Sequence, residues 1–196
     1  SIFSPGDNGQ WRGGCLPEIL RQPVEARMAD AKGVLVLGEP ASGGLGSTAR
    51  ELLAPARKVA SDLGEELAIG LLGDAVEGAA KQAISHGADK VYAVTHPLLG
   101  RYQPDLYLLA IEALCREVNP NIVLIGRTNE GRELAPRLAF RLGVGLAQDC
   151  LEISVDPSTK KLLANRPVYG GNAVAVVSCD YTPQIASIRP KAYEPL

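Results

Sequence analysis

The sequence predicts an α/β domain: a doubly wound, mostly parallel sheet in three layers, followed by an antiparallel extension at the C-terminal end. Two observations lead to this fold class. Between residues 33 and 153, short apolar runs alternate four times with stretches of helical period, and a fifth apolar run follows. After residue 156, three more runs follow with no helical stretch between them. Repeated strand–helix units pack as a parallel sheet with helices on both faces.

The first strand–helix unit occupies residues 33–64. The uninterrupted apolar run at 34–37 predicts a strand buried on both faces. Thr48 and Glu51 have the spacing of a capping box, and Gly64 suits the left-handed position after a helix end. Pro55 predicts a kink in this helix or a delayed start. The inward face is predicted from apolar residues at helical spacing: Leu52, Leu53, Ala56, Val59, Ala60 and Leu63.

Three further units repeat this pattern. Their strands are predicted at three apolar runs: residues 67–72, 91–94 and 122–125. Asp74 is predicted to cap the first of their helices. Pro104 is predicted at the first position of the second helix, and the third is predicted to start at Arg132. Gly87 and Gly143 are expected to end the first and the last of them. The inward face of the middle helix is predicted as Leu106, Leu109, Ala110, Ala113, Leu114 and Val118.

The two ends of the chain differ from this regular part. Residues 1–32 are rich in Gly and Pro, so we expect a loosely structured extension before a domain at 33–196. Beyond the last helix, strands are predicted at four runs: residues 145–153, 161–168, 173–179 and 184–188. The last three are expected to form an antiparallel extension on the sheet edge or a small β-flap.

The composition excludes several classes of function. Lys and Arg total 20 against 22 Asp and Glu, and the net charge of −2 offers no electrostatic reason to bind nucleic acid or an anionic membrane. No apolar run approaches the roughly 20 residues of a membrane-spanning helix, so no membrane insertion is expected. Four widely spaced cysteines and two histidines predict reduced thiols, a cytosol-like compartment and no metal site.

Ligands of doubly wound sheets bind beyond the carboxyl ends of the strands, where three loops are expected here. The first contains residues 42–48, which resemble the pyrophosphate loop of PP-loop adenylating enzymes, although Gly46 stands where that pattern has Asp. A flexible connecting loop is the other interpretation. The second loop contains His96, which is either an acid or base or, in the interpretation we favour, a structural residue. His86 suits the C-terminus of its helix.

The third loop is the most favourable one for an anion. Gly126, Arg127, Thr128 and Arg132 combine a glycine, a hydroxyl and two guanidinium groups before a helix. The other interpretation is a capped helix whose Arg–Glu pairs brace a subunit interface. The sequence has no recognisable triad or pair of catalytic carboxylates, so no catalytic site is expected.

An ordered series of motifs resembles the alpha subunit of electron transfer flavoprotein. The strongest segment, GRELAPRLA at 131–139, follows Gly126-Arg127-Thr128. The matching segments are 33–39, 87–92, 120–128, 131–139, 141–143, 145–150, 166–172 and 188–190. The segment around Tyr92 and the turn Gly170-Gly171-Asn172 are most similar to the forms that partner acyl-CoA dehydrogenases in anaerobic bacteria.

The resemblance implies a fold, cofactors and partners. The N-terminal domain of this subunit has an adenine-nucleotide-hydrolase-like, Rossmann-like fold, and a separate C-terminal domain binds FAD. We expect that flavin domain to lie beyond this chain, so no FAD-binding residue carries over to it. The beta subunit holds AMP or a second FAD, and the complex exchanges electrons with acyl-CoA dehydrogenases in the bacterial cytoplasm.

The expected function is therefore a scaffold in an electron carrier, without a catalytic site of its own. It would dock the beta subunit and the FAD domain. Two alternatives remain open. One is a free-standing adenine-nucleotide-binding or adenylating protein that uses the loop at 42–48. The other is a dimeric regulatory domain that senses a nucleotide.

Overall fold

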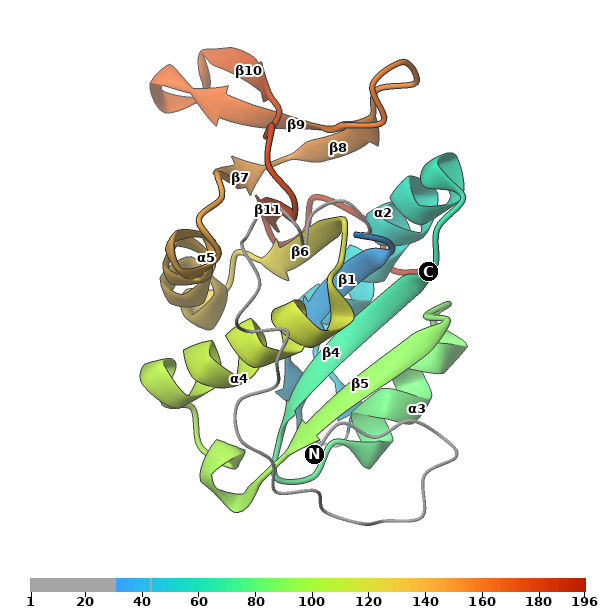
Figure 1. Cartoon of the computed structure of the whole chain (residues 1–196), viewed down its shortest axis with the longest axis vertical. Helices are drawn as coiled ribbons and strands as arrows, with labels where there is room; N and C mark the ends of the chain where they lie inside the picture. The colour runs from blue at the N-terminus through green and yellow to red at the C-terminus, as the bar shows by residue number, and fades with distance from the viewer. Residues whose placement is uncertain (1–30, 43) are drawn as a thin grey trace.

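The computed structural model describes residues 31–42 and 44–196, so most of the predicted extension at 1–32 lies outside the described residues. The centre is a six-stranded sheet in the order β5-β4-β1-β6-β11-β7, with every neighbouring pair parallel (Figure 1). Its strands are β1 (Val34–Gly38), β4 (Leu67–Gly73), β5 (Lys90–Thr95), β6 (Ile122–Gly126), β7 (Leu146–Cys150) and β11 (Gln184–Ile188). The predicted α/β class and parallel sheet are confirmed.

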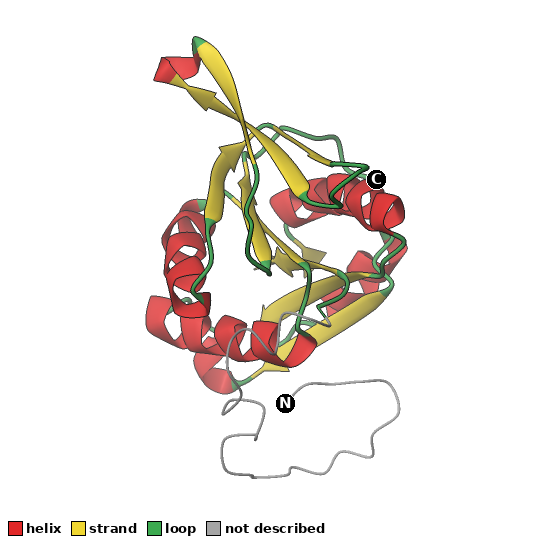
Figure 2. Cartoon of the chain, turned by 45° about the horizontal axis from the view of Figure 1, so that its top comes forward, coloured by secondary structure: helices red, strands yellow, loops and turns green. Residues whose placement is uncertain are grey.

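Four helices cover the two faces of this sheet (Figures 1 and 2). They are α2 (Ser47–Leu63), α3 (Glu77–Ser85), α4 (Pro104–Val118) and α5 (Asn129–Leu142). Val34 and Val36 of β1 belong to the core cluster that contains α2 and α3, whereas Leu35 and Leu37 belong to the cluster with α4 and α5. This alternation follows from the two-residue period of a strand, so one apolar run serves both cores.

An antiparallel flap of three strands extends from one end of the sheet (Figure 1, top). It contains β8 (Glu152–Val155), β9 (Leu162–Val168) and β10 (Ala173–Val177), in the order β10-β9-β8. The predicted β-flap is thus confirmed for β9 and β10. The predicted strand at 145–153 is wrong as a single strand, because Asp149 has a positive φ of 63° and the chain divides into β7 and β8.

The third C-terminal strand was expected in the flap, and this prediction is wrong. Residues 184–188 form β11, which lies inside the parallel sheet between β6 and β7. The predicted strand itself forms, but it is fully buried although it contains two polar residues, Gln184 and Ser187. Each makes a hydrogen bond there: Gln184 Oε1 accepts from the Leu162 N–H at 2.8 Å, and Ser187 Oγ accepts from the Asp149 N–H at 3.1 Å.

Two predicted helix caps are wrong. Helix α2 begins at Ser47 with Gly46 as its N-cap, so Thr48 lies inside the helix and the capping box does not form. Pro55 sits within this helix and does not delay its start. Helix α3 has Val76 as its N-cap, in place of the predicted Asp74. The predicted left-handed glycines after α2 and α5 are confirmed, with φ values of 69° and 71°.

The predicted inward face of α4 is partly wrong. Leu114 is buried as expected, but Leu109 and Ala113 are exposed and the buried residues are Leu108, Ile111, Leu114 and Cys115. Apolar residues occur around most of this helix, so the helical period alone could not decide which face turns inward. The start at Pro104 is confirmed.

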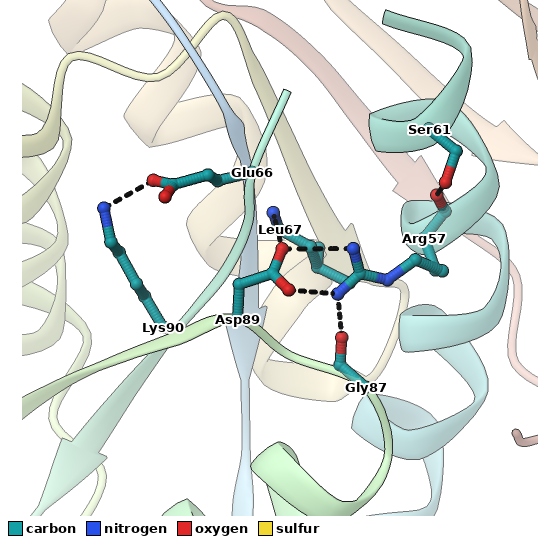
Figure 3. A network of polar contacts seen from close by, with 7 residues as sticks. All are labelled: Arg57, Ser61, Glu66, Leu67, Gly87, Asp89 and Lys90. Atoms are coloured by element: carbon teal, nitrogen blue, oxygen red, sulfur yellow. Dashed lines mark hydrogen bonds and ion pairs between the residues drawn. The ribbon is translucent and has the colours of Figure 1, made fainter. Parts of the chain in front are cut away.

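A polar network closes the amino ends of the strands (Figure 3). Arg57 of α2 donates from Nη1 and Nη2 to the carboxylate of Asp89, at 3.0 and 2.9 Å, and also donates to the Gly87 carbonyl. The Leu67 N–H donates to the same carboxylate at 2.8 Å. The bonds from Arg57 hold the pKa of Asp89 below its usual value. This network ties α2 to the turn before β5 and to the start of β4.

Candidate functional site

The carboxyl ends of the strands surround a cavity of about 270 Å³. It lies where β1 and β6 are neighbours while their following helices, α2 and α5, pack on opposite faces of the sheet. Doubly wound sheets bind ligands at the point where the connecting helices change from one face of the sheet to the other. Glu39 after β1, Asp74 after β4 and Glu130 of α5 line the cavity together with Tyr102 and Tyr107.

The chemistry of this cavity is acidic. Three carboxylates line it, and none of its described lining residues is a lysine or arginine. Burial raises the pKa of Glu39, and the neighbouring charge of Glu130 raises it further, although the hydrogen bond from Thr128 opposes both effects. Burial also raises the pKa of Glu130. A site of this charge repels a phosphate group.

The loop at 42–48 is built around a short hairpin of β2 (Pro40–Ala41) and β3 (Gly44–Leu45). The Gly46 N–H donates to the Glu39 carbonyl at 2.9 Å, and the Leu45 N–H donates to Gln82 Oε1 of α3 at 2.7 Å. A phosphate cradle needs such N–H groups to point at the ligand. These two N–H groups of the loop that resembles a phosphate loop are already committed to internal bonds.

The loop after β6 connects two strand ends. Thr128 caps α5, because its Oγ1 accepts from the Gly131 N–H at 3.0 Å, and this cap starts the helix at Asn129 rather than at the predicted Arg132. The same hydroxyl donates to the Glu39 carboxylate, which joins the loop after β6 to the loop after β1. Gly126 allows α2 to lie close to the end of β6, since a Cβ at this position would lie 2.5 Å from Thr48 Cγ2.

Arg127 turns toward β7 and is not among the residues that line the cavity. Its N–H donates to the Ile188 carbonyl at 2.7 Å, and its Nη1 lies 3.4 Å from Asp149 Oδ1. Arg189 donates to the same carboxylate through Nε and Nη2, at 3.0 and 2.7 Å. The bonds from Arg189 and the charge of Arg127 lower the pKa of Asp149. Two guanidinium groups thus hold Asp149 in its positive-φ conformation near the end of β7.

The predicted loop residues therefore do not converge on one site. Arg127 contacts Asp149, Thr128 contacts Glu39, and Arg132 is exposed on α5. No local pattern pointed to Asp149 as the partner of Arg127, because a carboxylate inside a predicted strand carries no ligand motif. The only available signal was its position in the matching segment at 145–150.

The two histidines have local structural contacts. His96 Nδ1 accepts from the Leu98 N–H at 3.2 Å and caps the short helix η2 (Pro97–Leu99). His86 Nδ1 lies 2.8 Å from the Gln82 carbonyl at the end of α3, as its predicted position implied. Within residues 31–42 and 44–196, no group of three or more His, Cys, Asp or Glu is placed to hold a metal ion.

Comparison with known proteins identifies the fold. The chain matches the family described as Electron transfer flavoprotein domain over residues 34–196, which contain all six strands of the sheet and the flap. The chain belongs to this family. The resemblance to electron transfer flavoprotein alpha subunits is thereby confirmed.

Several curated relatives are electron transfer flavoprotein subunits. The alpha subunit from Clostridium acetobutylicum is 43% identical over 169 residues, which cover 86% of this chain and 50% of the relative. The alpha subunit from Megasphaera elsdenii is 38% identical over 168 residues, with coverage of 85% and 50%. The acryloyl-CoA reductase electron transfer subunit beta from Anaerotignum propionicum is 34% identical over 180 residues, with coverage of 80% and 49%. The chain spans about half the length of these relatives.

Membership of the electron transfer flavoprotein family implies FAD, and the cavity does not fit this cofactor. FAD carries a pyrophosphate, whereas the cavity presents three carboxylates and no cation from its described lining. Its volume also lies below the roughly 300–1,000 Å³ of pockets that enclose small molecules.

No described helix is both long enough and apolar enough to cross a membrane.

Proposed function

We propose that this chain is the scaffold domain of an electron transfer flavoprotein alpha subunit, which docks the beta subunit and an FAD-binding domain and has no catalytic site. The single observation that carries this proposal is the family match across residues 34–196, with alpha subunits among the relatives. The acidic cavity supports it, because a domain that positions another domain's flavin needs no phosphate site of its own.

The flap supplies the surface for docking the beta subunit. Val174 and Val176 of β10 are 59% and 62% exposed, and Tyr169, at the tip of the flap, is 85% exposed. The flap extends away from the helices in Figure 2, so a partner can reach these side chains. Exposed apolar side chains gathered on one element are typical of a protein interface.

The loop containing Gly126, Arg127, Thr128 and Arg132 braces the base on which the other domains rest. Thr128 and Arg127 fix the strand ends through Glu39 and Asp149. Arg132 is exposed and offers its guanidinium group to a partner. In this interpretation the loop contributes rigidity rather than a nucleotide contact.

The complete complex carries FAD in the alpha subunit and AMP or a second FAD in the beta subunit. Acyl-CoA dehydrogenases are the redox partners, and the name of the Anaerotignum propionicum relative, an acryloyl-CoA reductase subunit, supports a substrate of the acyl-CoA class. The complex works in the bacterial cytoplasm. Cys115, Cys150 and Cys179 support a reducing compartment, because these described cysteines are free thiols.

Co-expression tests the proposal. The 196-residue chain is co-expressed with the electron transfer flavoprotein beta subunit of Clostridium acetobutylicum, and a 1:1 complex is expected in size-exclusion chromatography. Absence of a complex, even with an FAD-binding domain supplied, contradicts the docking role. Stoichiometric flavin bound to the isolated chain contradicts the scaffold role.

A thermal shift series separates the proposal from the adenine-nucleotide alternative. ATP, AMP and FAD are added to the isolated chain well above any plausible dissociation constant, and no rise in Tm is expected. A rise of several degrees with ATP, together with no binding of the beta subunit, favours a nucleotide-binding protein that uses residues 42–48.

A further inference from the structure

Strand β10 is an edge of the flap. It pairs with β9 through five residues, from Ala173 opposite Val168 to Val177 opposite Ala164. The strand order ends at β10, so its other side has no strand beside it among the described residues. A strand edge of this kind presents unpaired N–H and C=O groups to its surroundings.

Hydrogen bonds along β9 determine which backbone groups of β10 lie on the free side. The carbonyls of Lys161 and Asn165 accept from β8 and the residues flanking it, from the Asp156 N–H at 2.9 Å and the Leu151 N–H at 2.8 Å. The N–H of Leu162 turns the opposite way and donates to Gln184 at 2.8 Å. The backbone N–H and C=O groups of odd-numbered residues of β9 therefore point toward β8. Those of even-numbered residues point toward β10.

The pairing register carries this alternation across to β10. Ala175 lies opposite Arg166 and Val177 lies opposite Ala164, so these residues of β10 bond to β9. Val174 and Val176 alternate with them and direct their N–H and C=O groups to the free edge. Their side chains are the same ones that are more than half exposed. Both the backbone and the side chains of Val174 and Val176 are thus available to a partner.

Natural edge strands are usually protected by a charge, a proline or a bulge, and β10 has none of these. Its sequence is Ala-Val-Ala-Val-Val, and its pairing with β9 is regular. The edge strand β5 of the main sheet differs, because it begins with Lys90, which pairs with Glu66, and its remaining residues are half-buried. An unprotected edge in a folded protein indicates a surface that another chain covers.

We propose that an extended segment of the beta subunit adds to the free edge of β10 as a fourth strand of the flap. This inference rests on the proposed function, since it names how the docked subunit binds. Because β10 carries no charged side chain, it offers no ion pair to the added segment, which favours an uncharged one. The exposed valines favour β-branched or other apolar side chains opposite them. The N–H and C=O groups of Val174 and Val176 supply the hydrogen bonds to this segment.

Two proline variants form a matched pair that tests this geometry. Val176→Pro removes an N–H that points to the free edge and leaves the ladder with β9 intact. The variant loses one or two backbone hydrogen bonds to the partner, and the proline ring adds bulk at the edge. We therefore expect it to bind the Clostridium acetobutylicum beta subunit more weakly, by roughly tenfold or more. Ala175→Pro removes an N–H that points to β9, so it is expected to disrupt the flap itself. Val176→Ile keeps the N–H and an apolar, β-branched side chain, and is expected to bind within about twofold of the wild type.

Hydrogen exchange of the unmodified 196-residue chain gives a second measurement that needs no variant. Before binding, the amides of Val174 and Val176 are expected to exchange fast, and those of Ala175 and Val177 slowly. Binding of the beta subunit is expected to protect Val174 and Val176.

The outcomes separate this inference from the function on which it rests. Failure of the wild-type chain to bind the beta subunit overturns both. Wild-type binding that Val176→Pro leaves unchanged, without protection of Val174 and Val176, overturns strand addition alone. Light scattering that shows a dimer of this chain, abolished by Val176→Pro while beta-subunit binding persists, makes a second copy the occupant and also overturns the proposal.

Discussion

Strands β1 and β10 have similar apolar sequences and opposite surroundings. The residues of β1, Val-Leu-Val-Leu-Gly, are all buried, whereas three of the five residues of β10, Ala-Val-Ala-Val-Val, are exposed. In β1 the apolar side chains stabilise the folded chain, because helices cover both faces of the sheet. In β10 only Val177 packs against the core, whereas Val174 and Val176 are exposed and available for association. An apolar run therefore indicates burial but does not say whether the same chain provides it.

The largest effect is expected from a charge in the parallel sheet. Leu124→Asp places a carboxylate in the centre of β6, where the leucine is fully buried. Burial of an unpaired charge costs several kcal/mol, which is comparable to the roughly 5–15 kcal/mol that stabilises a whole domain. We expect loss of the cooperative unfolding transition in circular dichroism. A soluble variant with a wild-type Tm would show that the sheet tolerates a buried charge, and would contradict the prediction.

A smaller effect is expected at the junction between sheet and flap. Asp149→Asn removes the carboxylate that Arg127 and Arg189 share and leaves both guanidinium groups without their partner. We expect a loss of about 1–3 kcal/mol in urea unfolding. Arg127→Ala is the matched control, because Arg189 still holds Asp149 and the loss is expected to be smaller. Equal losses from the two substitutions would contradict the assignment of Arg189 as the main partner.

The same junction predicts a dependence on pH. The folded chain holds the pKa of Asp149 below its ordinary value of 3.8, so the ion pair stabilises the fold above that pH. This stability is lost as the pH falls below 3.8 and through the lowered pKa. Urea titrations from pH 6 downward are expected to show a steeper loss for the wild type than for Asp149→Asn. Parallel curves for the two proteins would contradict the prediction.

Glu39 in the cavity predicts the opposite sign. Burial raises its folded-state pKa above 4.5, so the stability that it contributes when protonated is lost as the pH rises from 4.5 through the raised value. Glu39→Gln keeps an acceptor for the Thr128 hydroxyl and does not ionise. We expect the variant to gain stability over the wild type as the pH rises through this interval, measured by Tm. A constant difference between the two proteins would show that Glu39 is not perturbed.

The smallest effect on stability is expected in the flap. The double substitution Val174→Asp and Val176→Asp places charges at exposed positions, where single changes usually alter unfolding by less than about 0.5 kcal/mol. Binding of the beta subunit is nevertheless expected to be lost. A large fall in Tm would show that these valines are part of the folding core, and would remove the contrast between β1 and β10.

The regular part of the fold could be predicted because local signals and tertiary structure agree there. Apolar runs predicted β1, β4, β5 and β6, and glycines predicted the ends of α2 and α5. Strand β11 was placed in the wrong sheet because Gln184 and Ser187 are polar, and their hydrogen-bond partners Leu162 and Asp149 lie far away in the sequence. A local pattern carries no information about such partners.

The candidate site was harder to predict for the same reason. The sequence identified Arg127 and Thr128 as residues with binding chemistry. It could not show that Thr128 contacts Glu39, 89 residues earlier, or that Arg127 turns toward Asp149. The first contact follows from the neighbouring positions of β1 and β6 in the sheet. The second follows from the insertion of β11 between β6 and β7.

The position of β11 has a consequence for how the chain reaches its final state during synthesis. β7 joins the parallel sheet through β11, which is synthesised after every other strand that the structure describes. A nascent chain that ends before residue 184 therefore leaves β7 detached and one side of β6 uncovered. The ribosome must therefore release the segment through residue 188 before the core of this sheet can close. A stop codon ahead of this strand would expose Ile122 and its neighbours to proteases, even though the four helices had already been translated.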